Sequence, residues 1–381
     1  MSNRRKITWA ALVAVAVLIK VFSYFPEAVE KYYSRGLYPV VSRLQRLLLG
    51  WIPFSVGDLA YGVVVVLLLL WVVRSARKLF RREAGRGWLL RGARRLVFAG
   101  LWLYVLFNVL WGLNYDRVGI AEQMHLQVQQ YSNADLFELT ATVVGELNAL
   151  HDTAVARRGS MAHFALLRAG AVAAYDSDAR FDPALTYKSR SVKVSIFSYP
   201  GLYIGFAGYY NPFSGEAQVN TFDPVFTQPY TTCHEMGHQL GYAKEDEANF
   251  VGFMAARSSA DPAFQYSVYM DLYRYAIREL YTRDSALALG LRSKVAPGVR
   301  EDLKELQRFN RRYENPIEPW IWKVYSRYLQ ANRQPRGIVT YSELTAWLIA
   351  YGKKFGIGVI RPPHPVVWYV PIEVIPAEGG H

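Results

Sequence analysis

Residues 234–250 read HEMGHQLGYAKEDEANF and carry the clearest chemical signal in the chain. On a helix, His234 and His238 lie on one face about 6 Å apart along the axis, so both imidazoles can bind one Zn²⁺. Glu235 adjoins a ligand without being one. Its carboxylate is expected to act as general base on the metal-bound water and then to protonate the leaving amine. With seven histidines in 381 residues, an accidental HExxH has odds of about one in a hundred.

A third ligand is expected from the acidic residues that follow this motif. In a straight helix Glu245 would lie about 10 Å beyond His238, which is too far to share a metal. Gly241 permits a left-handed helix end and a reversal of the chain. A second helix starting near Lys244 then brings Glu245 back toward the histidines. Three protein ligands and one open position are typical of a catalytic zinc site.

Two acids are candidates for this ligand, because only one of several successive helical side chains can face a metal. Glu245 is favoured, since Asn249 lies one turn further on the same face and can orient a ligand by a hydrogen bond. Glu247 is the alternative. The acids that do not bind the metal are expected to form a solvated helix N-terminus, which the helix dipole favours.

The sequence around this motif predicts an α+β fold. Residues 190–221 alternate in Val, Ile, Tyr, Phe and Gly between turn signals, which predicts two or three strands of a small antiparallel sheet. The tail from Pro362 is Pro-rich and is expected to be extended. Apolar residues at helical spacing predict helices over residues 132–158, 161–176, 230–240, 245–257, 262–288, 300–331 and 340–354.

Three apolar stretches precede this domain, at about residues 7–25, 56–73 and 96–113. Each is close to the roughly 20 residues that cross a hydrocarbon core. We therefore expect a three-helix transmembrane region over residues 1–115 and a mainly helical domain with a small sheet over residues 116–381. No small-residue cleavage site follows the first stretch, so we interpret it as an uncleaved anchor.

The charge pattern predicts the orientation of the membrane region. The formal net charge is +13, and the whole excess lies before residue 118. Residues 74–95 hold nine of these basic residues and are expected to form a cytoplasmic loop, which leaves the N-terminus inside and the second domain outside the cytoplasmic membrane. Basic residues that flank membrane spans indicate contact with the lipid bilayer rather than with nucleic acid. A single cysteine, Cys233, excludes a disulfide scaffold.

The motif HEMGHQLG followed by E-x-x-A-N resembles the gluzincin branch of zinc peptidases, a resemblance that implies a zincin-like fold. The resemblance also implies that His234, His238 and Glu245 bind the metal and that Glu235 is the general base. It implies Asn249 as the residue that orients a metal ligand by a hydrogen bond. The link from His238 to Glu245 is shorter than in typical gluzincins. More closely, the three apolar stretches, GFAGYYNPFSGEAQVN and HEMGHQLGYAKEDEANF together resemble a family of bacterial membrane proteins known as domain of unknown function 3810, with a metallopeptidase-like site.

These observations predict a membrane-anchored, zinc-dependent metallohydrolase, a peptidase acting on peptide or envelope substrates. The alternative is a non-catalytic envelope protein with a structural or degenerate zinc site. Transport is disfavoured, because the apolar stretches carry only Lys20 as an internal charge. A group that stabilises the oxyanion is also expected. Tyr209, Tyr210, Tyr242 and a downstream residue all remain open for that role, and the substrate and the oligomeric state are not predicted.

Overall fold

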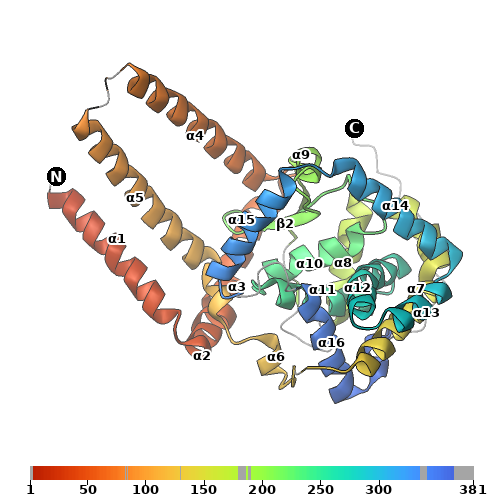
Figure 1. Cartoon of the computed structure of the whole chain (residues 1–381). Coiled ribbons are helices and arrows are strands. Elements are labelled where there is room, and N and C mark those ends of the chain that lie inside the picture. The colour runs from red at the N-terminus through yellow and green to blue at the C-terminus, as the bar shows by residue number, and fades with distance from the viewer. Residues whose placement is uncertain are drawn as a thin grey trace, which may run out of the picture.

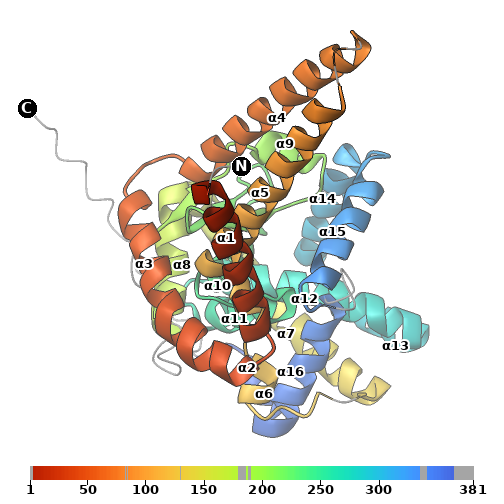
Figure 2. The ribbon, with the colours of Figure 1, turned by 90° about the vertical axis from the view of Figure 1, so that its left-hand side faces the viewer.

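The computed structural model describes residues 3–81, 83, 85–128, 130–178, 186–187, 190–334 and 341–363. Three long helices project from one side of a helical body (Figure 1). They are α1 (Asn3–Phe22), α4 (Val56–Phe80) and α5 (Arg86–Leu110). Figure 2 looks at the molecule from that side, with the three helices in front of the body. The mainly helical structure with a small sheet confirms the predicted elements, whereas the zincin-like identity of the body remains a prediction.

Two of the projecting helices are long and apolar enough to cross a membrane. α4 and α5 each have 25 residues. α1 is a third candidate when it is joined to the helical segment Pro26–Leu49, from which it is bent by 104°. The structure therefore supports membrane association through two or three helices, at the places where the apolar stretches lie.

The basic stretch 74–95 is not the loop that we expected. α4 continues through its first half to Phe80, and α5 already begins at Arg86. Arg and Lys are good helix formers, so a helix does not end where its apolar run ends. α5 correspondingly stops at Leu110, before a 3₁₀ turn, η2 (Gly112–Asp116).

Residues 26–55, expected as a plain connection between spans, are also mostly helical. Because Pro26 and Pro39 lie in first turns, where no backbone N–H partner is needed, neither proline interrupts the helical path. The segment consists of α2 (Pro26–Ala28), a π-helical stretch η1 (Val29–Leu37) and α3 (Tyr38–Leu49).

The body is built from helices that match the predicted ones closely. Two predicted helices are each divided in two. The helix predicted over 262–288 is divided because Asp284 caps a new helix, and the one over 300–331 is divided because residues 314–317 interrupt it. The predicted extended tail lies largely outside the described residues. The helices are α6 (Ile120–Gln123), α7 (Asn133–Met161), α8 (Phe164–Asp178), α9 (Ser198–Leu202), α10 (Gln228–Gln239), α11 (Glu245–Ser258), α12 (Pro262–Arg283), α13 (Ser285–Lys294), α14 (Pro297–Tyr313), α15 (Glu318–Ala331), α16 (Tyr341–Phe355) and the 3₁₀ turn η5 (Ile357–Ile360).

The small sheet has three strands in the order β1-β3-β2. β2 (Gly208–Asn211) and β3 (Glu216–Val219) form an antiparallel hairpin, but β1 (Val192–Val194) runs parallel to β3. The prediction of an antiparallel sheet is therefore wrong for one pair. The predicted turn at Pro200-Gly201 lies in helix α9, and the connection through α9 carries the chain to the other side of β3, which allows parallel pairing.

Two buried carboxylates join α4 to this sheet. Glu216 accepts a hydrogen bond of 2.8 Å from the backbone N–H of Gly57 and so satisfies a donor that the helix start leaves unpaired. Asp58 accepts from the Ser195 hydroxyl at 3.1 Å and from the backbone N–H of Ile196 at 2.6 Å. The helix that we expect to cross the membrane thus begins inside the body.

Candidate metal centre

The HExxH motif lies on α10, as predicted. Pro229 stands in the first turn, where a missing N–H costs nothing. The helix stops because Gly241 adopts a φ of 91°, a left-handed conformation that a side chain would strain. A Cβ at Gly241 would also come within 2.8 Å of the Tyr38 ring. Glycine at this position is therefore required both by the turn and by the packing.

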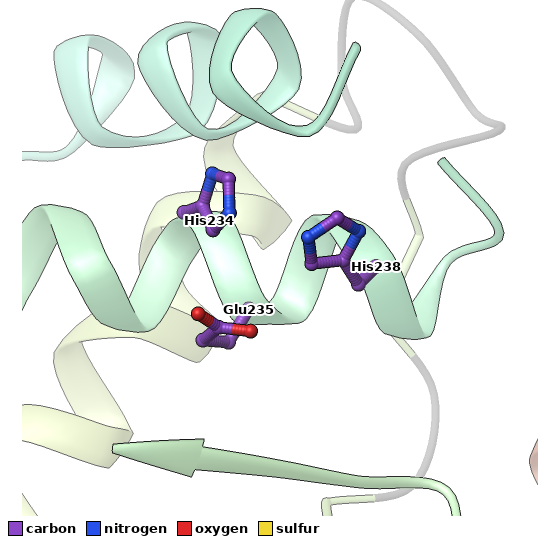
Figure 3. Close-up of side chains that lie close together, drawn as sticks. All are labelled: His234, Glu235 and His238. Carbon is purple, nitrogen blue, oxygen red and sulfur yellow. The ribbon is translucent and has the colours of Figure 1, made fainter. Parts of the chain in front are cut away.

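The three polar side chains of the motif gather at one place on this helix. His234, Glu235 and His238 each have one ligand atom within 4.8 Å of the others (Figure 3). His238 and Glu235 are buried, and the side chain of His234 is only 12% exposed. The spacing predicted from helix geometry is therefore present in the structure.

The chain reversal at Gly241 brings Glu245 onto the same centre. α11 begins at Glu245, and the two helices pack against each other. One oxygen of the Glu245 carboxylate lies 3.4 Å from Nε2 of His234, and the other lies 3.8 Å from Nε2 of His238. The Glu245 carboxylate thus lies beside both imidazoles, and the three residues form a candidate donor set whose chemistry suits zinc.

The neighbouring acids point elsewhere, although they are buried rather than solvated. Glu247 pairs with Lys244 at 3.4 Å and lies near Gly119. Asp246 accepts a hydrogen bond of 2.9 Å from the backbone N–H of Glu247, as acidic side chains do at helix starts. The prediction of a solvated helix start is therefore wrong, since α10 and the residues before α6 cover it. Among the three acids, Glu245 is the one that the structure places beside both histidines.

Asn249 lies one turn beyond Glu245, but within the described part of the chain its side chain bonds to Tyr230 and not to a metal-ligand candidate. Its side-chain oxygen lies 3.3 Å from the Tyr230 hydroxyl, and the Tyr230 ring packs edge-on against His234 at 6.5 Å. Asn249 is therefore connected to the centre through Tyr230 and not directly, as we had expected.

Glu235 faces the sheet from the same helix. A Cβ built on Gly208, the first residue of β2, would come within 2.9 Å of Oε1 of Glu235. Figure 3 shows a strand running beneath this carboxylate. Among the described residues, Oε2 of Glu235 has no hydrogen-bond partner although it is buried. A buried acceptor without a hydrogen bond costs free energy of folding. This oxygen would therefore gain by taking up a proton or by accepting a hydrogen bond from a ligand.

His238 is held in one tautomer. Its Nδ1 lies 2.7 Å from the backbone carbonyl oxygen of Tyr242, which can only accept a hydrogen bond. The proton is therefore on Nδ1, and Nε2 presents a lone pair toward Glu245. Metal-binding histidines commonly use such a carbonyl to fix the ring. Tyr242 thus contributes to the centre through its backbone carbonyl, which orients His238.

Burial and mutual charge shift the pKa values of these four groups in opposite directions. Burial raises the pKa of Glu235 to about 8 and lowers the pKa of His238 to about 4. Burial also disfavours the charged forms of His234 and Glu245, but the hydrogen bond and the attraction between these two groups outweigh the effect of burial. The pKa of His234 is raised to about 9 and that of Glu245 is lowered. At neutral pH a proton therefore occupies His234, where a metal would have to displace it.

Tyr325 was not singled out by sequence reasoning, which placed it only within the predicted helix 300–331. Its hydroxyl donates a hydrogen bond of 2.7 Å to Oε1 of Glu245. It comes from α15, eighty residues away along the chain, and no local pattern marks it. Of the predicted oxyanion candidates, Tyr209 donates to Asp58, and the hydroxyl of Tyr210 lies 3.4 Å from that of Tyr38. Tyr325 is the downstream residue that reaches the centre.

Segments from the membrane-associated part complete the end of α10. The Tyr38 hydroxyl donates to the carbonyl of Gln239 at 2.8 Å, and Nε1 of Trp111 donates to that of His238 at 3.1 Å. The Gln239 carbonyl ends the helix and has no partner within it, whereas the His238 carbonyl also accepts a hydrogen bond of 3.0 Å from the backbone N–H of Gly241. The centre therefore depends on α3 and on the end of α5 as well as on the body.

Residues 33–349 match the model of a family described as "Protein of unknown function (DUF3810)". The chain belongs to the DUF3810 family. No curated protein and no solved structure matches this chain. The matched part begins within η1 and ends within α16, so it includes both the apolar helices α4 and α5 and the candidate metal centre. Because the family has no described activity, its function must be argued from the site.

Proposed function

We propose that this protein is a membrane-anchored, zinc-dependent metallohydrolase, and specifically a peptidase. The observation that carries the proposal is Glu235. It lies within 4.8 Å of both histidines, it is buried, and one of its oxygens is not used by any described residue. A structural zinc site fills its coordination with protein ligands and has no need of such a base.

The donor set fits zinc by its chemistry. Two neutral imidazole nitrogens and one carboxylate are a common set in catalytic zinc sites. His234, His238 and Glu245 would hold the ion. Zinc bound there would supply Lewis acidity, which makes water nucleophilic at neutral pH and polarises a substrate carbonyl.

The remaining chemistry belongs to side chains of this protein. Glu235 would take up the proton of the attacking water on its free oxygen and deliver it to the leaving amine. Burial raises the pKa of Glu235 in the metal-free protein, which favours the uptake of a proton by this carboxylate. Tyr325 is a positioning residue, since its hydroxyl donates its single proton to Glu245 and so orients that carboxylate.

The membrane arrangement is part of the proposal. The clusters of basic residues lie in the first turn of α1, at the end of α4 and at the start of α5. The positive-inside rule then puts the N-terminus and residues 74–95 in the cytoplasm and the metal centre outside the cytoplasmic membrane, with α1, α4 and α5 as three spans. Peptides of the cell envelope are the substrates that such a position favours.

A second candidate is a non-catalytic envelope protein with a structural zinc site. It is favoured by burial, since the side chains of His238 and Glu245 are only 7% and 8% exposed. A structural site would still hold zinc but would not need Glu235.

Glu235→Gln separates the two candidates, because glutamine keeps the shape and cannot accept the proton. The protein, purified in detergent, is loaded with zinc and given a mixture of fluorescence-quenched peptides of random sequence. We expect the variant to keep its zinc and to lose at least about a hundredfold in hydrolysis rate. Hydrolysis by the wild type that Glu235→Gln leaves unchanged would contradict the role of Glu235.

A further inference from the structure

The depth of the metal centre relative to the membrane can be read from the basic residues. A hydrocarbon core of about 30 Å takes roughly 20 helical residues. Counted from Arg74 back along α4, that length ends near Phe54. Counted from Arg95 along α5 and on into the 3₁₀ turn η2, it ends near Tyr115. The outer edge of the hydrocarbon would therefore lie at the first turn of α4 and at the end of α5.

The same two places touch the metal centre. Trp111, at the end of α5, packs edge-on against the ring of His238, with 5.9 Å between ring centroids. In the second turn of α4, Tyr61 stacks on Tyr209 at 6.5 Å. Tyr209 follows the residue of β2 that lies against Glu235. The metal centre is therefore level with the outer edge of the hydrocarbon and not far above it.

Helix α3 gives independent evidence that the metal centre lies close to the membrane surface. The segment that contains α3 leaves α1 at 104°, so it runs along the membrane surface if α1 crosses the membrane. One face of α3 is buried on the body through Tyr38, Ser42 and Arg46. The opposite face and the residue just beyond the helix are apolar and exposed, up to 78% for Trp51. They comprise Val40, Leu44, Leu47, Leu48 and Trp51. An amphipathic helix with this distribution is typical of the membrane interface.

A second apolar surface lies on the other side of the centre. α9 and α15 lie on the side of the body from which α1, α4 and α5 project (Figures 1 and 2). Their exposed side chains include Tyr199, Tyr203, Trp320 and Val324, with Trp320 66% exposed. α15 is also the helix that carries Tyr325 to Glu245. Trp and Tyr are the residues that concentrate at lipid headgroup level.

An apolar groove lies beside the body end of the membrane helix α4. It has a volume of about 370 Å³ and lies between α4 and the residues Ile196 and Phe197. Its lining on α4 runs from Leu67, which lies within the apolar stretch, up to Asp58. Asp58 accepts the hydrogen bond of Tyr209, beside Glu235. The groove thus runs from the depth of the lipid tails to Asp58, and the hydrogen bond of Tyr209 to Asp58 joins its upper end to strand β2.

We infer that the metal centre opens at the lipid boundary and that its substrate is a polypeptide anchored in the membrane. This inference rests on the proposed function. The bond that is cleaved lies where the polypeptide leaves the bilayer, and apolar residues still within the membrane occupy the groove beside α4. The surfaces of α3, α9 and α15 hold the body against the headgroups, which presents the centre to such a segment.

The position of the centre is tested without activity. Nitroxide labels are placed on single cysteines at Tyr199, Trp320 and, as control, the exposed Leu289 of α13, in chain reconstituted into liposomes. The native Cys233 is buried, so the wild-type chain treated with the same label measures the background labelling. We expect labels at 199 and 320 to collide more with oxygen dissolved in lipid than with a water-soluble nickel chelate, and the label at 289 to do the opposite. Labels at 199 and 320 that are as water-accessible as the one at 289 would overturn the inference.

The substrate is tested with one peptide sequence in two forms, free and joined to a transmembrane anchor, in liposomes that hold the zinc-loaded chain. We expect the anchored form to be cleaved at least about tenfold faster. Equal cleavage of both forms would overturn the anchored substrate but not the peptidase. Cleavage of neither would overturn the peptidase and its substrate, while the labels would still report the position of the centre.

The groove is tested with Gly62→Leu, which fills it, against Gly100→Leu on α5, where a Cβ meets open space. We expect Gly62→Leu alone to slow cleavage of the anchored peptide about tenfold, with zinc content and cleavage of the free peptide unchanged. Equal rates for the two variants would overturn the role of the groove.

Discussion

Helix α4 is apolar and exposed, whereas α10 is polar and buried. Each residue from Val63 to Val73 on α4 is at least 45% exposed. On α10, by contrast, Thr232, Glu235, His238 and Gln239 are almost inaccessible. A protein folded in water would show the reverse. The difference indicates that α4 is surrounded by lipid, while the polar groups of α10 are either satisfied by partners or kept for chemistry.

The two helices are nevertheless secured in the same way, by polar groups from the other part of the molecule. Glu216 of the body receives the first N–H groups of α4, and Tyr38 and Trp111 from the membrane-associated part satisfy the last carbonyls of α10. Without Glu216, buried N–H groups at the start of α4 would have no partner, whereas without Tyr38 and Trp111 each of the two α10 carbonyls would lose one of its donors. Membrane part and metal centre are therefore expected to lose stability together.

Glu216→Ala should have the largest effect, because it leaves the buried N–H groups at the start of α4 unsatisfied. We expect the free energy of unfolding to fall by about 3 kcal/mol. Thermal unfolding in detergent, followed by tryptophan fluorescence, measures this. The control is Glu301→Ala, an exposed glutamate on α14, for which a change within about 0.5 kcal/mol is expected. Equal effects of the two substitutions would show that Glu216 does not secure α4.

Tyr325→Phe should weaken zinc binding about tenfold, which is about 1.4 kcal/mol. The variant removes the hydrogen bond to Glu245 and keeps the ring. Competition with a zinc chelator measures the affinity. Tyr328→Phe, one turn further on α15, removes a hydroxyl that faces Tyr115 at 3.3 Å, and it should leave zinc affinity unchanged. An unchanged affinity in Tyr325→Phe would remove Tyr325 from the centre.

Tyr38→Phe should cost about 1 kcal/mol of stability, because the Gln239 carbonyl loses one of its donors. The shift in Tm reports it. Tyr199→Phe, with its exposed hydroxyl, is the matched control and should be neutral. If both variants unfold at the wild-type temperature, α3 does not stabilise α10.

Zinc uptake at pH 7 should release about one to two protons per chain. His234, with a pKa raised to about 9, is protonated in the metal-free protein, and Glu235, at about 8, largely so. His238, lowered to about 4, is already neutral. The release should fall as the pH rises through 9, since the protons have then left. Calorimetry in buffers of different ionisation enthalpy measures this number, and a release that does not change from pH 7 to pH 9.5 would contradict the assignment.

Local patterns in the sequence were sufficient for the core of the site. The helical spacing of His234 and His238 and the turn at Gly241 predicted which residues come together. This was possible because the whole candidate donor set lies within residues 234–245. Tyr325 and Glu216 could not be predicted, since each reaches its partner across more than seventy residues of chain. The direction of β1 was wrong for the same reason, because pairing depends on where α9 carries the chain.

Zinc content of the detergent-purified chain tests the metal centre most directly. Elemental analysis of the wild type is compared with Glu245→Ala and with its matched control Glu247→Ala, two residues further on the same helix. We expect about one zinc per chain in the wild type and in Glu247→Ala, and a loss of most of it in Glu245→Ala. A wild type that stays without zinc after zinc is added, or a Glu245→Ala chain that keeps it while Glu247→Ala does not, would contradict the proposed centre.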